Sequence, residues 1–235
     1  MLWVVDAEAA RRLLRAGRLR CPDCRGTLRG WASARPRRVR LPGGVEETLR
    51  PDRSRCAACR RTHVLLPASC VPRRAYGVEV VGQALLAKVD GAGHRAIGDR
   101  LGVPVGTVRR WMRGVRGGLS RLVAEAVTMV RNAGVCVLDG RSPATSSLGG
   151  GELTEALHML GVAGHAVARP SPPPQPTAPA AGTTGIDYLG LLVARARQRL
   201  IEELRVADPA GLSGAPPWQV ANIVTAGRLL RAGPG

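Results

Sequence analysis

The sequence predicts a mainly α-helical protein with a small β ribbon at its N-terminus. Two observations favour this fold class. The first is a pair of CxxC motifs, Cys21/Cys24 and Cys56/Cys59, which lie 31 residues apart among turn-forming and β-prone residues. The second is the recurrence of apolar residues at helical spacing from Val78 onward.

Composition limits how these elements can pack. The chain has 235 residues, which suggests one or two domains, and it has no Phe and only two Tyr. Its cores must therefore be built from Leu, Val, Ala and a few Trp. A net charge of +18 far exceeds what solubility requires and favours a polyanionic partner such as nucleic acid.

The charge is unevenly distributed along the chain. Residues 1–75 carry a net charge of +12, residues 76–118 carry +4, and residues 119–235 carry +2. We therefore expect the phosphate-facing surface in the first two segments, and a different role for the C-terminal half.

Residues 1–75 form the first predicted domain. A short helix is expected from Ala7 to Ala16, with Asp6 as its N-cap and Gly17 as its stop. Short strands follow within residues 27–40 and 45–49, separated by a turn at residues 42–44, and a β-prone run at residues 62–66 closes a small antiparallel ribbon.

The two CxxC motifs predict a metal site. Each motif can turn two sulfur atoms inward from one tight knuckle, so Cys21, Cys24, Cys56 and Cys59 can supply four thiolates to a tetrahedral Zn²⁺. Four protein ligands leave no open position for substrate, so the zinc is expected to be structural. Residues 1–75 are therefore predicted to be an Arg-rich zinc-ribbon domain. Iron in a rubredoxin-like site is the main alternative, but the basic, aromatic-poor surroundings favour zinc. A redox-active pair is disfavoured because no βαβ pattern surrounds either motif.

Three further residues of this domain have two interpretations each. His63 could replace a metal ligand, but its place on the closing strand favours packing beside the ribbon. Cys70 follows the second knuckle too late to be a ligand and is expected to be a small buried residue. Trp31 could stack on a base, but covering the apolar face of the ribbon is the favoured interpretation.

Residues 76–118 form a predicted helix-turn-helix domain of three helices. The first helix runs from Val78 to Val89, and a second begins at His94. Gly98 and Gly102 stand where such motifs require a small residue and a turn glycine. The exposed face of the last helix is expected to contact DNA through five residues: Val105, Gly106, Arg109, Arg110 and Arg113. The alternative is a helical hairpin in an ordinary bundle.

The remaining chain divides into three predicted segments. Residues 119–167 are a helical extension, residues 168–185 a Pro-rich linker, and residues 186–235 a C-terminal amphipathic helix and tail. The C-terminal helices could mediate self-association, bind a transposase or pack on the helix-turn-helix.

Three stretches, CPDC, RCAACRRTHVLLP and GHRAIGDRLGVPVGTVRRW, together resemble a family of uncharacterised actinobacterial proteins with a zinc ribbon followed by a helix-turn-helix. They are also similar to the N-terminal DNA-binding region of insertion-sequence transposases. The resemblance covers residues 18–115. It implies double-stranded DNA as the partner, the four CxxC cysteines as zinc ligands, and Arg109, Arg110 and Arg113 as DNA contacts.

The functional expectation is a non-catalytic DNA-binding protein, either a transposition-associated accessory factor or a transcriptional regulator. A transposase needs several carboxylates on a sheet, and only Asp139 follows a strand-like run in the right context. The alternative is a truncated or degenerate transposase with residual nuclease chemistry through Asp139. No signal peptide or apolar run long enough to span a membrane is present, so we expect no membrane partner and a cytoplasmic protein that is nucleoid-associated when bound.

Overall fold

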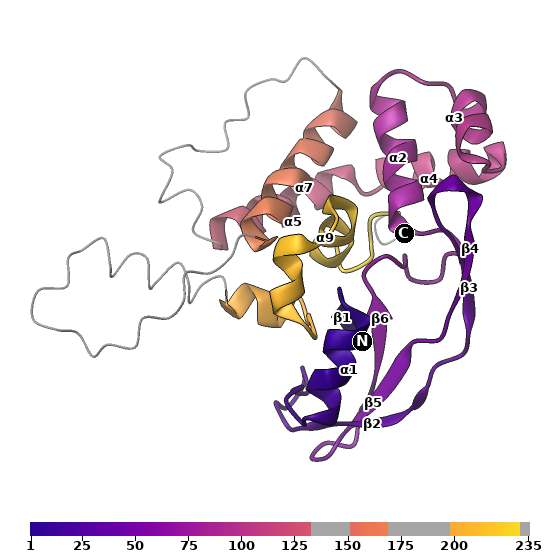
Figure 1. Cartoon of the computed structure of the whole chain (residues 1–235). Helices are drawn as coiled ribbons and strands as arrows, with labels where there is room; N and C mark the ends of the chain where they lie inside the picture. Colours follow the sequence, from indigo (N-terminus) through magenta and orange to yellow (C-terminus); the bar gives the residue numbers. More distant parts are fainter. Residues whose placement is uncertain (133–150, 169–197, 231–235) are drawn as a thin grey trace, which may run out of the picture.

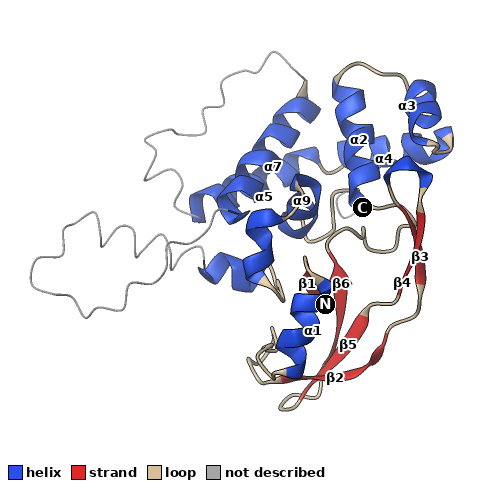
Figure 2. Cartoon of the chain, viewed as in Figure 1, coloured by secondary structure: helices blue, strands red, loops and turns tan. Residues whose placement is uncertain are grey.

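A computed structural model describes residues 1–132, 151–168 and 198–230. A strand-rich N-terminal part lies at one end of these residues, and the helices gather at the other (Figure 1, Figure 2). This confirms a mainly helical protein with a small N-terminal β region. The strands are β1 (Leu2–Val4), β2 (Leu28–Ser33), β3 (Arg37–Arg40), β4 (Glu46–Leu49), β5 (Asp52–Cys56) and β6 (Thr62–Pro67). The α-helices are α1 (Ala7–Arg15), α2 (Val78–Val89), α3 (His94–Leu101), α4 (Val105–Arg116), α5 (Leu119–Asn132), α7 (Glu152–Ala168) and α9 (Pro217–Val224), and the short 3-10 helices are η1 (Pro42–Gly44) and η2 (Pro209–Gly214).

Four strands form one sheet in the order β1-β6-β5-β2. The pairs β2/β5 and β5/β6 are antiparallel, as expected for a ribbon, whereas β1 pairs with β6 in parallel. The N-terminal strand was not predicted, because three residues are too few to show a period and their pairing partner lies some sixty positions away in sequence.

The predicted first helix is confirmed. The side chain of Asp6 caps α1 by accepting hydrogen bonds from the backbone N–H groups of Glu8 and Ala9, at 2.8 and 3.1 Å. Gly17, with a φ of 66°, ends it. The helix lies against one face of the sheet, where Ala10 packs in a small core with Leu28 and other buried residues. This packing leaves the opposite face of β2 and β5 without a covering helix.

The strands β3 and β4 form a separate antiparallel hairpin that reaches toward the helices (Figure 1). Its turn contains Gly43 and Gly44, whose φ values of 75° and 76° only glycine adopts readily. This turn, η1, contacts α3. The hairpin therefore connects the strand-rich end to the helix pair that follows.

The helices α2, α3 and α4 follow the predicted periodicity, and α5 and α7 occupy the predicted helical extension. The side chains of these helices share one hydrophobic core with Trp3, Val39 and Leu66 from the strand-rich part. The core is thus continuous across residues 75 and 118, where the sequence suggests domain boundaries. No described helix combines the length and the apolar character needed to cross a lipid bilayer.

The C-terminal segment returns to both ends of the molecule, which the sequence did not indicate. Val206 forms a parallel bridge with Trp3, and the Ala207 N–H donates to the Trp3 carbonyl at 2.8 Å. Further on, α9 packs against α2 and α7. The buried side chain of Asn222 donates to the Ala68 and Cys70 carbonyls at 2.8 and 3.0 Å. The segment therefore joins the sheet to the helices.

Two glycines mark where this segment approaches the helices most closely. A Cβ atom built on Gly82 of α2 would lie 2.1 Å from the indole ring of Trp218, and one on Gly114 of α4 would lie 2.4 Å from the Leu230 carbonyl oxygen. Any larger residue at either position would push the C-terminal segment away from the helix.

Some predicted features lie outside the described residues. These are the Pro-rich linker beyond Ala168, the start of the last amphipathic helix, Cys136 and Asp139. Residues 198–203, at the end of that predicted helix, are helical.

We predict that Gly82→Ala destabilises the protein by about 1–3 kcal/mol, because the added methyl group meets the Trp218 ring. Replacing an exposed helical glycine with Ala ordinarily has the opposite effect, of about 1 kcal/mol. Gly161→Ala in α7 is the matched control, since nothing lies within 4 Å of a Cβ atom there. Urea unfolding of both variants measures the difference. Equal stabilities would show that the C-terminal segment does not pack on α2.

Candidate metal centre and basic helix

The two CxxC motifs fold into knuckles with matching backbone hydrogen bonds. In the first, the Cys21 N–H donates to the Gly26 carbonyl at 2.7 Å and the Arg25 N–H donates to the Cys21 carbonyl at 2.8 Å. In the second, the Cys56 N–H donates to the Arg61 carbonyl at 2.9 Å and the Arg60 N–H donates to the Cys56 carbonyl at 3.2 Å. Both turns therefore direct their two sulfur atoms toward the same side.

An arginine follows each knuckle in a left-handed conformation. Arg25 has a φ of 60° and Arg60 a φ of 63°. Glycine is the residue that adopts this conformation without steric cost, and a side chain there costs about 1–2 kcal/mol. The matching φ values show that the two knuckles end in the same backbone conformation.

Gly26 lets the two knuckles meet. A Cβ atom at this position would lie 3.0 Å from the sulfur of Cys56 and 2.9 Å from the Cβ of Ala58. A side chain at Gly26 would therefore separate the knuckles.

The four sulfur atoms form one cluster. All of them lie within 4.8 Å of one another, with Cys21 and Cys59 3.7 Å apart and Cys24 and Cys56 3.4 Å apart. Cys21 and Cys56 are buried, whereas Cys24 and Cys59 face the surface. The predicted ligands are thus brought together in a set that could bind a metal ion.

The environment favours one thiolate and opposes a second. Burial raises the pKa of Cys56, but hydrogen bonds from the Cys59 and Ala58 N–H groups and from Cys24 outweigh it and lower the pKa to about 6. The N–H group of Arg61 lowers the pKa of Cys59, yet the neighbouring thiols and burial together raise it to about 12. A metal cation would remove this conflict, because it stabilises all four thiolates together.

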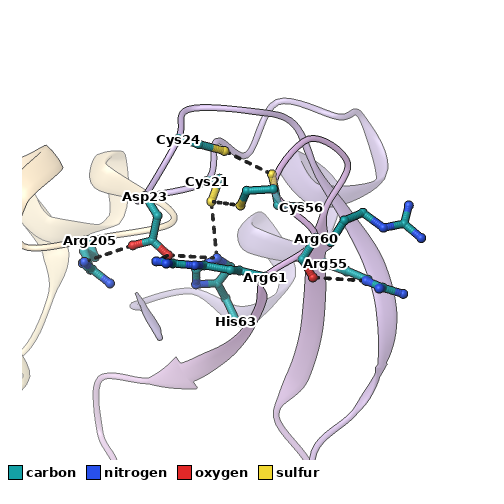
Figure 3. A network of polar contacts seen from close by, with 10 residues as sticks. Cys21, Asp23, Cys24, Arg55, Cys56, Arg60, Arg61, His63 and Arg205 are labelled. Carbon is teal, nitrogen blue, oxygen red and sulfur yellow. Dashed lines mark hydrogen bonds and ion pairs between the residues drawn. The ribbon is translucent and has the colours of Figure 1, made fainter.

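His63 lies directly beside the cluster. Its side chain is buried, and its Nε2 is 3.4 Å from the Cys21 sulfur and 3.9 Å from an Asp23 oxygen (Figure 3). Burial lowers the pKa of His63, so the imidazole is neutral near pH 7. With its hydrogen on Nε2 it would donate to the Cys21 sulfur, and Cys21, Asp23 and His63 also lie close enough together to hold a metal ion.

Asp23 connects the first knuckle to distant parts of the chain (Figure 3). Arg61 and Arg205 each contact its carboxylate at 3.3 Å, and the Arg61 hydrogen bond holds the pKa of Asp23 below its usual value. Nearby, Arg25 pairs with Glu202 at 2.6 Å. This network was not predicted, because Glu202 and Arg205 lie about 180 positions from the knuckle and no sequence motif links them to it.

The prediction for Cys70 is confirmed, whereas the prediction for Trp31 is wrong. Cys70 is buried away from the sulfur cluster, as predicted, and burial raises its pKa. Trp31 was expected to cover the apolar face of the ribbon, but 56% of the residue is exposed, so it does not. Trp31 lies at an irregularity in the pairing of β2 with β5, between Gly30 and Ala32.

A tight turn sets the geometry of α3 and α4. Gly102 adopts a φ of 61°, and a Cβ atom on Gly98 would lie 2.7 Å from the Val103 carbonyl oxygen. Both glycines are therefore required for the chain to reverse here. Pro104 precedes α4, and its carbonyl accepts from the Thr107 N–H at 2.8 Å, so the helix begins without a side-chain cap.

The face of α4 predicted to contact DNA is largely exposed. Gly106, Arg109, Arg110 and Arg113 are all exposed, whereas Val105 is partly buried. The opposite face of the helix enters the core through four residues: Val108, Trp111, Met112 and Val115. Within the described part of the chain, none of these three arginines forms an ion pair.

Comparison with protein families finds a match to a domain of unknown function, DUF6431, over residues 21–111. The matched range begins at the first CxxC cysteine and ends within α4. It thus includes the whole sulfur cluster, α2 and α3. No curated protein and no solved structure matches the chain.

We predict that metal affinity increases with pH. Metal binding requires thiolates. Cys59, with its pKa of about 12, is protonated at pH 7, so binding displaces its proton. Below pH 6 the proton of Cys56, with its pKa of about 6, must be displaced as well, and the affinity should fall more steeply.

Competition with a chromophoric chelator at pH 5, 6, 7 and 8 and constant ionic strength measures this dependence. Cys70→Ala is the control, because Cys70 lies outside the cluster and its loss should leave the profile unchanged. An affinity that is constant from pH 5 to pH 8 contradicts coordination by this thiol set.

Proposed function

We propose that this chain is a non-catalytic DNA-binding protein in which a structural zinc ion maintains the ribbon and α4 contacts duplex DNA. The observation that carries the proposal is the exposed arginine face of α4, presented by a glycine turn from α3. Catalysis is not part of the proposal. Asp139, on which a nuclease activity would depend, lies outside the described residues.

The donor set supports zinc. Four sulfur ligands at about 2.3 Å from a tetrahedral zinc ion would lie about 3.8 Å apart. The observed sulfur separations of 3.4 and 3.7 Å are close to this value. Four protein thiolates complete the coordination shell, so a metal there stabilises the fold and has no open position for water or substrate.

The shape and charge of α4 support duplex DNA. Arg109, Arg110 and Arg113 follow one another at helical spacing on a single face, so about one turn of helix presents three guanidinium groups. The major groove of B-DNA admits an α-helix, and arginine can contact guanine or phosphate there. We infer that α3 and α4 act as a helix-turn-helix, with α4 as the recognition helix.

The biological role follows from resemblance. Because residues 18–115 resemble the DNA-binding region of insertion-sequence transposases, we propose a transposition-associated accessory factor or a transcriptional regulator. A transposase, or a second copy of this chain, is the protein partner we propose for the C-terminal helices. The described part of α9 packs on α2 and α7, so such a partner would contact the remaining surface.

We expect the purified protein to contain about one zinc ion per chain and to be colourless, because zinc, unlike iron, has no visible absorption in a thiolate site. Chelation should unfold the ribbon, since metal binding and folding are coupled in small sites of this kind. Mass spectrometry under native conditions and circular dichroism check both. Cys24→Ser should reduce zinc content and Cys70→Ala should not. A coloured, iron-containing sample would overturn the choice of metal.

Arg109→Ala and Arg110→Ala should weaken binding to duplex DNA, by about 1–3 kcal/mol where the residue contacts a base. A phosphate contact would instead reduce the slope of log affinity against log salt by about 1. Fluorescence anisotropy with duplexes selected from a random pool, at several salt concentrations, separates the two cases.

Arg12→Ala is the matched control for these variants, because Arg12 is an exposed arginine on α1 whose partner is Glu8. Its loss should change affinity little. Duplex binding that is insensitive to salt, or equal in all three variants, would refute α4 as the DNA-contacting helix.

A further inference from the structure

The face of the ribbon sheet that points away from α1 is strongly basic. Side chains alternate between the two faces of a strand. Leu28, Ser54 and Cys56 are buried on the α1 side, so Arg53 and Arg55 of β5 point to the other face. Arg29 lies directly opposite Arg55 in the β2/β5 register and shares that face. Three arginines from two neighbouring strands therefore share one face, with Arg29 exposed and Arg53 and Arg55 partly buried.

Trp31 extends this surface. Alternation along β2 puts it on the same face as Arg29, and the irregularity between Gly30 and Ala32 leaves it without a cross-strand partner. The guanidinium carbon of Arg55 lies 4.5 Å from the centre of the ring. A large aromatic side chain with 56% exposure beside a cation is thus held in place without being covered.

Several arginines elsewhere on the ribbon are paired with carboxylates. Arg11 pairs with Asp52, Arg40 with Glu46, and Arg61 with Asp23.

On the open face the hydrogen bonds of the arginines end on neutral oxygens. Arg53 donates to the Thr62 hydroxyl at 3.4 Å, and Arg55 donates to the Arg60 carbonyl at 3.1 Å. Among the described residues, no carboxylate forms an ion pair with Arg29, Arg53 or Arg55.

Folding alone does not explain this arrangement. Like charges directly opposite one another in a sheet are destabilising, and Arg29 faces Arg55. The exposed Trp31 beside them leaves apolar surface in contact with water, which is also unfavourable. Both features become favourable when an anionic ligand with a flat, stackable group covers the face.

We propose that this face binds single-stranded DNA, with one base stacked on Trp31 and the adjacent phosphates bound by Arg29, Arg53 and Arg55. In a duplex the faces of each base are covered by its neighbours, so a ring fixed on a flat sheet can stack only on a base of an unpaired strand. The proposal rests on DNA being the partner of this protein, but it uses a surface separate from α4. The chain would therefore engage a duplex through α4 and an unpaired strand through the ribbon.

The test compares a fluorescein-labelled dT12 strand with a mixed-sequence duplex of 20 base pairs, using anisotropy with the zinc-loaded full chain at low salt. Trp31→Ala should weaken dT12 binding by about 5- to 100-fold and leave duplex binding within about twofold, because the stacking contribution is lost only for the unpaired strand. Trp31→Phe should recover most of the affinity, since a smaller ring still stacks. Val45→Ala, which removes an exposed apolar side chain from the β3–β4 hairpin, is the matched control and should change neither affinity.

Charge is tested separately with Arg55→Gln. This variant should reduce dT12 affinity and lower its salt dependence, with zinc content and circular dichroism unchanged. Intrinsic fluorescence provides an independent readout: dT12 should quench the wild-type emission more than that of Trp31→Phe, since Trp3 and Trp111 are buried and the ring of Trp218 packs on Gly82 of α2.

The outcomes separate this inference from the proposed function. If duplex binding depends on Arg109 and Arg110 while dT12 binding is unaffected by Trp31→Ala, the ribbon surface is refuted and the role of α4 stands. If dT12 binding depends on Trp31 but no duplex binds, the surface stands and the proposed role of α4 fails. Tighter Trp31-dependent binding of rU12 than of dT12 would overturn the assignment to DNA.

Discussion

Two turns that are 31 residues apart in sequence bring four sulfur atoms within 4.8 Å of one another, and the rest of the ribbon is arranged around that contact. The apolar residues near it are few. The small core beneath α1 contains only nine buried residues, two of which are themselves clustered cysteines: Leu2, Val4, Ala10, Leu19, Cys21, Leu28, Cys56, Leu65 and Ala207. This core is small, so a metal ion bridging the knuckles, as we propose, would add to the free energy of folding of the ribbon.

The C-terminal segment connects the knuckles to the helices. Glu202 and Arg205 bind Arg25 and Asp23 beside the first knuckle, and the chain then adds a bridge to Trp3 before it reaches α9. Asn222 bonds to the loop after β6 from inside the core. Because the same segment also packs on α2 and α4, the ribbon and the basic helix are fixed relative to each other. The two surfaces that we propose for DNA are thus held at a constant separation, which would let them engage adjacent parts of one DNA molecule.

Local signals in the sequence were sufficient for the parts that depend on neighbouring residues. The cap at Asp6, the turn glycines Gly98 and Gly102, and the apolar stripe of α2 all produce the predicted structure, because each is determined by interactions within a few positions. The four cysteines were recognised for the same reason: each pair sits in one short turn.

The parts that could not be predicted depend on pairing across long distances. The parallel pairing of β1 with β6, and the return of residues 206–230, bring together positions that no spacing connects. Trp31 was misjudged because the sequence does not show which face of the ribbon is covered: Trp31 lies on the face opposite the buried Leu28. His63 was placed beside the ribbon, but its contact with Cys21 depends on how β6 and the first knuckle meet.

The claim on which the account depends most is that the four thiolates together form a closed zinc site. X-ray absorption at the zinc edge of the purified full chain tests it directly, because the method counts and identifies the atoms bound to the metal. The account predicts a single shell of four sulfur atoms at about 2.3 Å. A mixed shell with a nitrogen atom at about 2.0–2.1 Å would contradict it, and would place His63 among the ligands instead of behind them.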